Sequence, residues 1–319
     1  MAWGIVRPGP GGYYGCFTLL LPRGTAMPKE KVQGKDAFSI GIIGDLHTHF
    51  DDVDVQQLNA QDYDLLFFTG DLGGGSRESS LSMARLLSNL DGRVMVMPGN
   101  NDTVDIQELA AELTHRKGLN RIMAITRQTD NDNEVTLCGY SLHQVEAGSR
   151  RVSLIAARPH SMGGPELTFP DYMAHTYDIH SLEDSVARLR SLVDQADDDI
   201  IFLAHNGPLG LRDAPADIWG CDFKPGGGDW GDPDLADAIV HARAVGKRVL
   251  AVVAGHMHLR TKQGAERPWR VERDDALYIN AARVPRIFNG SDDVYRHHVA
   301  LEISTDKLEV NEVLVPQGY

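Results

Sequence analysis

The stretch Ile40-Gly-Ile-Ile-Gly-Asp45-Leu-His47-Thr-His49 is an apolar run that ends in one carboxylate and two imidazoles. A short, continuous apolar run is typical of a strand that is buried on both faces, as in a sheet covered by helices. Side chains that directly follow such a strand lie at the carboxyl edge of the sheet, where α/β proteins bind their ligands. This stretch therefore predicts a layered α/β fold with a functional site at the end of its first strand.

Four more apolar runs end in polar side chains in the same way. They run into Gly70-Asp71, Gly99-Asn100-Asn101-Asp102, His205-Asn206 and Gly255-His256-Met257-His258. Because strand ends of this kind meet at one edge of the fold, we expect their side chains to converge. The converging residues with the chemistry of metal ligands are Asp45, His47, Asp71, Asn100, His205, His256 and His258.

This mixture of carboxylate, imidazole and amide groups suits manganese, iron or zinc better than a metal that selects thiolates. Seven ligands are more than one tetrahedral zinc ion takes, whereas two ions that share a bridging carboxylate account for the number. Two divalent ions about 3.5–4 Å apart hold a bridging hydroxide, a strong nucleophile at neutral pH, and clamp the oxygens of an in-line displacement. The motifs therefore predict a dinuclear metal centre that acts on a phosphate ester.

The rest of the chain first alternates strands and helices, as in a layered α/β domain. Apolar runs predict strands at 38–43, 63–69, 94–97, 200–204 and 249–254. Helical spacing, with Ser76, Ser181 and Asp232 as N-caps, predicts helices at 51–60, 76–92, 104–113, 181–193 and 232–246. Closely spaced β segments at 121–125, 134–142 and 151–157 predict a second, antiparallel or mixed sheet. We expect a loop at 158–180, and we expect the second sheet to close with 277–280, 297–303 and 308–315.

Residues 38–319 are predicted to form a single domain after a disordered leader at 1–37. The first 26 residues contain no Asp, Glu or Ser, which makes Met27 an alternative start. A transit peptide is the minor alternative, because it should contain serine. Residues 206–232 are rich in Gly, Asp, Pro and Trp and begin next to a predicted ligand, so we expect an ordered, lid-like loop.

The composition narrows the class of function. The chain has 31 Lys and Arg against 45 Asp and Glu, and this net charge of −14 opposes general binding to nucleic acid or to an anionic membrane. Its 3 cysteines are scattered, which favours a reducing, cytoplasmic compartment without a disulfide framework. No apolar run reaches the roughly 20 residues of a membrane span. A small phosphate ester is therefore the expected partner.

The ordered set Gly44-Asp45-x-His47, Gly70-Asp71, Gly99-Asn100-x-Asp102, His205 and Gly255-His256-x-His258 resembles the calcineurin-like metallophosphoesterases. Further segments resemble a cyanobacterial and plant-type subgroup: Ala157-Arg158-Pro159, Ala204-His205-Asn206-Gly207-Pro208, Gly228-Asp229-x-Gly231-Asp232-Pro233-Asp234 and Asn280-Ala281-Ala282-Arg283-Val284-Pro285-Arg286. The resemblance implies a four-layer α/β/β/α sandwich in which two mixed β-sheets pack face to face between helices.

The resemblance also implies a division of the ligands. Asp45, His47 and His258 would hold the first metal, Asn100, His205 and His256 the second, and Asp71 would bridge them. Manganese is the first choice of divalent metal, with iron, zinc or nickel as alternatives.

One position departs from the family pattern, because Asn101 stands where the family usually has a histidine. That histidine is thought to orient the phosphate and to protonate the leaving group, and an asparagine cannot transfer a proton at neutral pH. His49, or Asp102 acting through a water, is a candidate replacement. Arg158 is a candidate for binding the substrate phosphate, although an arginine at a loop start more often pairs with a carboxylate.

The favoured function is hydrolysis of a phosphomonoester or phosphodiester. A non-catalytic, metal-loaded binding or scaffold module of the same fold is the alternative that Asn101 raises. A third interpretation takes Asp45-Leu-His47-Thr-His49 as the first strand end of a metal-dependent amidohydrolase barrel, but it leaves Gly70-Asp71 unexplained. The natural substrate, the metals and the oligomeric state are left open by the sequence.

Overall fold

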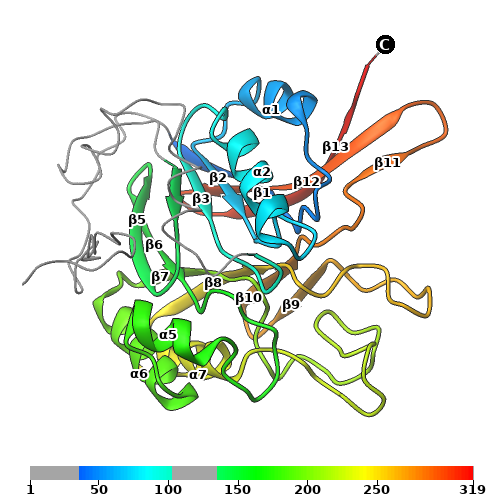
Figure 1. Ribbon diagram of the computed structural model, residues 1–319. Helices are drawn as coiled ribbons and strands as arrows, with labels where there is room; N and C mark the ends of the chain where they lie inside the picture. The colour runs from blue at the N-terminus through cyan, green and yellow to red at the C-terminus, as the bar shows by residue number, and fades with distance from the viewer. Residues whose placement is uncertain (1–35, 103–134, 319) are drawn as a thin grey trace, which may run out of the picture.

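The structure, a computed structural model, describes residues 36–102 and 135–318 and arranges them in two β-sheets (Figure 1). The first sheet contains β1 (Ala37–Ile43), β2 (Leu65–Phe68), β3 (Val94–Val96), β4 (Val135–Leu137), β11 (Ile287–Asn289), β12 (Val294–Ser304) and β13 (Leu308–Pro316). The second contains β5 (Ser141–Ala147), β6 (Arg150–Ala156), β7 (Asp199–Leu203), β8 (Arg248–Ala254), β9 (Arg270–Arg273) and β10 (Ala276–Asn280). Residues 1–35 of the predicted leader, the helix at 104–113 and the strand at 121–125 lie outside the described residues, and Ala37 of the predicted leader already belongs to β1.

The strand order brings the predicted strand ends together. The first sheet has the order β11-β12-β1-β2-β3-β4, with β13 beside β12, and β1, β2, β3 and β4 run parallel. The second has the order β5-β6-β7-β8-β10-β9, in which β6, β7, β8 and β10 run parallel. The carboxyl ends of β1, β2 and β3 therefore form one edge of the first sheet, and those of β7 and β8 form one edge of the second.

Three separate apolar cores define the layers. One contains residues of both sheets, such as Ile42 and Phe67 from the first and Ile201 and Val253 from the second. A second core joins the other face of the first sheet to α1 (Asp52–Asn59) and α2 (Arg77–Leu87). The third joins the other face of the second sheet to α5 (Pro170–Tyr177), α6 (Leu182–Gln195) and α7 (Pro233–Ala244). The predicted four-layer α/β/β/α sandwich is confirmed, and its two open sheets are not the barrel that the amidohydrolase interpretation requires.

The predicted N-caps stand where the helices begin, but they do not all cap. Ser76 and Ser181 accept hydrogen bonds from the backbone amides of Ser79 and Asp184, as expected of N-caps. Asp232 precedes α7, yet its side chain makes no cap bond. Its carboxylate instead accepts hydrogen bonds from other buried groups, which the next subsection describes.

Three predictions about secondary structure were wrong. The segment 134–142 is not one strand, because the chain leaves the first sheet after Leu137 and enters the second at Ser141. The segment 158–180 is not a continuous loop, because it contains α5, whose start at Phe169 lacks a capping side chain that would reveal it in the sequence. The strands β12 and β13 do not close the second sheet, because β12 pairs antiparallel with β1 of the first.

Among the described residues, no helix combines the length and the apolar character that crossing a membrane requires.

Candidate metal centre

Two groups of potential metal ligands lie at the strand ends. The first metal group is Asp45, His47 and His258, and the second metal group is Asp71, His205 and His256. Within each group the nitrogen and oxygen atoms that could bind a metal lie within 4.8 Å of one another. The structure thus brings together six of the seven side chains predicted to be ligands, and Asn100 lies beside the second group.

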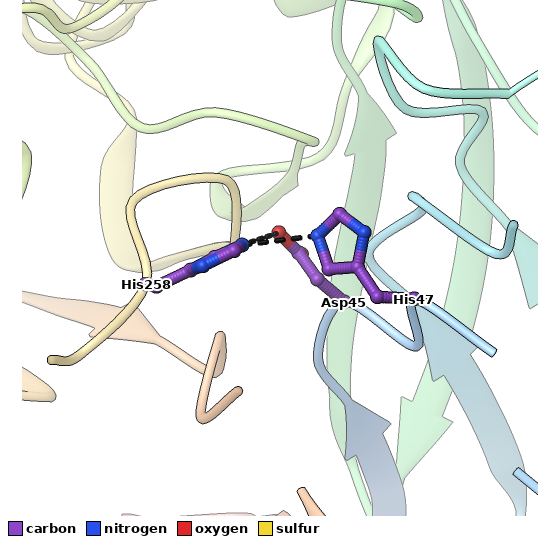
Figure 2. A group of neighbouring side chains, drawn as sticks. All are labelled: Asp45, His47 and His258. Carbon is purple, nitrogen blue, oxygen red and sulfur yellow. Dashed lines mark hydrogen bonds and ion pairs between the residues drawn. The ribbon is translucent and has the colours of Figure 1, made fainter. Parts of the chain in front are cut away.

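In the first metal group, two imidazoles face a carboxylate (Figure 2). The Nε2 atoms of His47 and His258 are 3.0 Å apart, and Nε2 of His258 lies 3.8 Å from Oδ2 of Asp45. Two hydrogen bonds orient the Asp45 carboxylate: Thr69 Oγ1 donates to its Oδ1 at 2.8 Å, and the His256 amide donates to its Oδ2 at 3.0 Å. Two imidazole nitrogens and a carboxylate that converge in this way are suitable donors for one divalent cation.

In the second metal group, His205 is fully buried and its ring orientation is fixed. Its Nδ1 donates to the carbonyl oxygen of Thr69 at 2.7 Å, and its Nε2 lies 2.9 Å from Asn100 Oδ1 and 3.6 Å from Asp71 Oδ1. A hydrogen bond from the other ring nitrogen to a carbonyl is the usual support of a metal-binding histidine.

Asp71 faces both groups. Its Oδ2 lies 3.5 Å from Nε2 of His47, and its Oδ1 lies 3.6 Å from Nε2 of His205. Burial would raise the pKa of Asp71, but the neighbouring imidazoles of His205 and His256 outweigh it and lower the pKa. Asp71 is therefore an ionised carboxylate with one oxygen directed to each group, which is the arrangement that a bridging ligand requires.

The histidines of the second group differ in their electrostatics. Burial would lower the pKa of His205, but the carboxylates of Asp71 and Asp45 raise it overall. Burial, together with the nearby His205, lowers the pKa of His256 to about 4. His256 is thus a neutral imidazole at physiological pH, the form that binds metals.

The glycines of the motifs permit this close approach of strand ends. A Cβ atom at Gly99 would lie 2.3 Å from Asp71 Oδ1, and one at Gly255 would lie 2.2 Å from Asp45 Oδ1. The backbone also turns sharply at two of the ligands. Asp71, which follows Gly70, has a φ of 47°, and His256, which follows Gly255, has a φ of 67°. Non-glycine residues rarely adopt such positive φ values, and those that do often lie at functional sites.

Asn101 contacts the carboxylate between the two groups. Its backbone amide donates to Asp71 Oδ1 at 2.8 Å, and its side-chain Nδ2 donates to Asp71 Oδ2 at 2.7 Å. The neighbouring Asp102 accepts hydrogen bonds from the amides of Leu72 and Gly99 at 2.8 and 2.9 Å, and burial raises its pKa to about 6. Asn101 thus orients the shared carboxylate, while Asp102 ties together the loops that carry it.

The remaining predicted site residues lie in other surroundings. Arg158 is 1% exposed, and its guanidinium donates to Asp234 Oδ2 at 2.9 Å and to Asp232 Oδ1 at 3.0 Å. These two carboxylates give Arg158 a structural role at the start of α7, and its binding of substrate stays a prediction. The His49 side chain is exposed, and the His49 carbonyl accepts a hydrogen bond from Arg286 at 3.2 Å. The role of His49 as a proton donor to the leaving group likewise stays a prediction.

The sequence did not reveal two residues that border the second metal group. The carbonyl oxygen of Met162 lies 3.2 Å from His256 Nε2 and accepts a hydrogen bond from Trp230 Nε1 at 2.9 Å. A backbone carbonyl leaves no pattern in a sequence, and a tryptophan in a long loop does not show in the sequence which residue its indole N–H will contact. Within the segment 206–232, the Asp229 carboxylate accepts hydrogen bonds from the amides of Gly210 and Leu211 at 2.7 and 3.1 Å.

Comparison with known protein families identifies the family of the chain. The family of calcineurin-like phosphoesterases matches residues 38–260, which is more than half of the chain, and the protein therefore belongs to this family. This confirms the resemblance that the motifs indicated. Comparison with curated protein sequences finds no match.

Solved structures support the fold. One crystal structure is 11% identical, aligns over 86% of this chain and 99% of its own, and has a TM-score of 0.53. TT1561 of Thermus thermophilus is 12% identical over 86% of this chain and 98% of its own, with a TM-score of 0.49. The zinc complex of Vps29 from Entamoeba histolytica is 12% identical over 88% of this chain and 100% of its own, with a TM-score of 0.35. At these identities the first structure shows a shared fold, and none of them shows a shared activity.

Proposed function

We propose that the protein is a dinuclear-metal-dependent phosphoesterase. The observation that carries the proposal is the position of Asp71, whose two oxygens face His47 in one group and His205 in the other at 3.5 and 3.6 Å. A shared carboxylate between two sets of imidazole donors is a built arrangement for two neighbouring divalent ions. Membership of the calcineurin-like phosphoesterase family supports the same chemistry.

The donor atoms fit divalent ions such as manganese, with iron, zinc and nickel as alternatives. In this proposal Asp45, His47 and His258 hold one ion, Asn100, His205 and His256 hold the other, and Asp71 bridges them. When bound, the ions supply Lewis-acid activation of water and neutralise the charge on the phosphoryl oxygens. The two cysteines of the described residues, Cys138 and Cys221, lie outside both groups.

The protein's own residues prepare this site before a substrate enters. Thr69 orients Asp45 through its hydroxyl and orients His205 through its carbonyl. Asn101 fixes Asp71 through two hydrogen bonds. Donors that are already oriented lose little conformational freedom when a ligand binds, and such preorganisation strengthens electrostatic stabilisation of a transition state.

A metal-supplemented assay tests the proposal. With Mn²⁺, the wild type should hydrolyse bis(p-nitrophenyl) phosphate or p-nitrophenyl phosphate, and Asp71→Asn should lower kcat/KM on the order of 10³-fold, because one negative charge between the two groups is lost. Asp178→Asn changes an exposed carboxylate at the C-cap of α5; it is the matched control and should act as the wild type does. The proposal fails if neither ester turns over with Mn²⁺, Fe²⁺, Zn²⁺ or Ni²⁺ although the protein binds the metal.

A second candidate, a non-catalytic metal-loaded binding module, is favoured by Asn101. Its amide cannot deliver a proton to a leaving group, and its Nδ2 is engaged with Asp71. Asn101→His should therefore raise kcat/KM for alkyl phosphate esters, which need a proton on the leaving group, by at least about 10-fold. It should change the turnover of p-nitrophenyl esters little. An equal effect on both ester types would show that a missing acid does not limit the reaction.

A further inference from the structure

Large apolar side chains gather on the loops next to the second metal group. Met162 is 46% exposed and Phe223 is 44% exposed. The exposed large apolar side chains of the described residues are Met162, Leu209, Phe223, Val240, Val245 and Leu314. The first three of them belong to the loops 158–169 and 206–232, which carry Met162 and Trp230 near the second metal group. An apolar patch of this kind commonly marks a binding surface.

A continuous set of contacts leads from the metal centre to this surface. The Met162 carbonyl oxygen is 3.2 Å from His256 Nε2 and also accepts the Trp230 indole N–H at 2.9 Å. The ring of Trp230 in turn meets the ring of Phe223 edge to face, with centroids 5.4 Å apart. Only one carbonyl group therefore separates a residue of the second metal group from this pair of aromatic rings.

Trp230 is fixed in place, whereas Phe223 is open to solvent. A Cβ atom at Gly163 would lie 2.6 Å from Trp230 Cδ1, and one at Gly164 would lie 3.1 Å from Trp230 Cε2. The two glycines thus allow the indole to lie directly against the loop backbone. Phe223 packs against this fixed indole, and its exposed side chain can contact a ligand.

Two lysines accompany the aromatic pair. Nζ of Lys224 lies 5.2 Å from the centroid of Trp230, and Nζ of Lys262 lies 5.7 Å from the centroid of Phe223. The nearby carboxylate of Asp222 is paired with Arg267 at 3.2 Å. In a chain of net charge −14, two lysines beside the half-buried Trp230 ring and the exposed Phe223 ring are suited to a ligand that is both aromatic and anionic.

We propose that Met162, Phe223 and Trp230, here called the aromatic rim, bind a planar aromatic group attached to the phosphate of the substrate. Lys224 and Lys262, which lie beside these rings, attract the same anionic molecule through their positive charge. Aromatic rings prefer offset or edge-to-face contacts with other rings, and methionine adapts to their shape. The substrate class is therefore an aryl or nucleoside phosphate ester. This inference rests on the proposed function, because the metal centre would hold the phosphoryl group of that ester.

Binding of two phosphonates that are not hydrolysed tests the aromatic rim. Phenylphosphonate and methylphosphonate share the anionic head and differ in the ring, so the ratio of their dissociation constants isolates the ring contact. In the Mn²⁺-loaded wild type, titration calorimetry should show phenylphosphonate binding about 10-fold more tightly, the effect of one good aromatic contact. Phe223→Ala should reduce this ratio to about 2, and Phe223→Tyr should restore it.

The controls separate this inference from the proposed function. Val240→Ala removes an even more exposed apolar side chain on α7, outside the aromatic rim, and should keep the wild-type ratio. Equal affinities of the wild type for both phosphonates would overturn the aromatic rim and leave the phosphoesterase proposal standing. Failure of the loaded protein to bind either phosphonate would overturn both. A ratio unchanged in Phe223→Ala would also overturn the assignment of the ring contact.

Discussion

The second metal group is more deeply buried than the first, because two of its three side chains are buried and only Asp45 is buried in the first. The side chains of His205 and Asp71 are 0% and 2% exposed, and those of His47 and His258 are 20% and 38% exposed. The Thr69 carbonyl orients His205, but His47 and His258 face mainly each other, with Nε2 atoms 3.0 Å apart. The difference suggests two unequal sites that share Asp71.

Unequal bracing has a consequence for metal binding. Outer hydrogen bonds to ligating histidines are worth about 10- to 100-fold in metal affinity, because they fix the tautomer and the ring orientation. We therefore expect the second metal group to hold the first equivalent of metal and to exchange it slowly. The first metal group should bind its ion more weakly and exchange it with solvent.

Single histidine substitutions give the largest expected difference between the groups. His205→Ala should abolish the tight site and weaken binding of the first equivalent of Mn²⁺ by more than about 100-fold. His47→Ala should leave that first equivalent nearly unchanged and weaken the second by about 10-fold. Equilibrium dialysis with Mn²⁺ measures both. Equal losses in the two variants would refute the inequality of the sites.

Metal removal should produce a smaller effect on the fold. A ligand present at 100 times its dissociation constant stabilises the folded state by about 2.7 kcal/mol, which raises the Tm of a domain of this size by about 5 °C. Chelation of the Mn²⁺-loaded protein should lower the Tm by this amount in the wild type and by less in His205→Ala. Differential scanning calorimetry reports the shift. A larger loss in His205→Ala than in the wild type would contradict the tight assignment of the second group.

Acid should destabilise the fold through histidines outside the metal centre, and this effect must be separated from loss of metal. Burial, with help from Arg93, lowers the pKa of His143 to about 4. The unfolded chain takes up a proton near pH 6.5 and the folded protein does not, so stability present above pH 6.5 is lost as the pH falls toward 4.

The size of this loss can be measured on chelated protein. Between pH 7 and pH 5, His143 should account for a fall of about 2 kcal/mol in the free energy of unfolding. His143→Gln should show a correspondingly shallower dependence on pH in urea denaturation, while His180→Gln, at an exposed position, should follow the wild type. Parallel curves for all three proteins would show that His143 is not an acid-sensitive element.

The strands of the fold could be predicted from the sequence more fully than their pairing. The ends of β1, β2, β3, β7 and β8 were recognisable, because strands buried on both faces are continuous apolar runs and polar residues follow them abruptly. The pairing of β12 with β1 could not be predicted, because the pattern of side chains identifies a strand but not the strand beside which it lies. The break at Tyr140 between β4 and β5 was missed for the same reason.

Within the candidate site, residue types were easier to predict than their partners. Aspartate and histidine at strand ends carry a chemical signal in the sequence. The contacts that decide their roles are formed across large separations: Asn101 to Asp71 across 30 positions and Arg158 to Asp234 across 76. Asp232 illustrates the limit, since a residue at an N-cap position turns out to bind Arg158 at 3.0 Å. Such pairings depend on which loops the fold brings together.

The central claim is that Asp71 joins two unequal metal groups into one centre. Electron paramagnetic resonance of the protein loaded with two equivalents of Mn²⁺ tests it directly, because two manganese ions bridged by a carboxylate are magnetically coupled. We expect the coupled signal in the wild type and an isolated six-line Mn²⁺ signal in Asp71→Asn. An isolated six-line signal in the fully loaded wild type would contradict the claim.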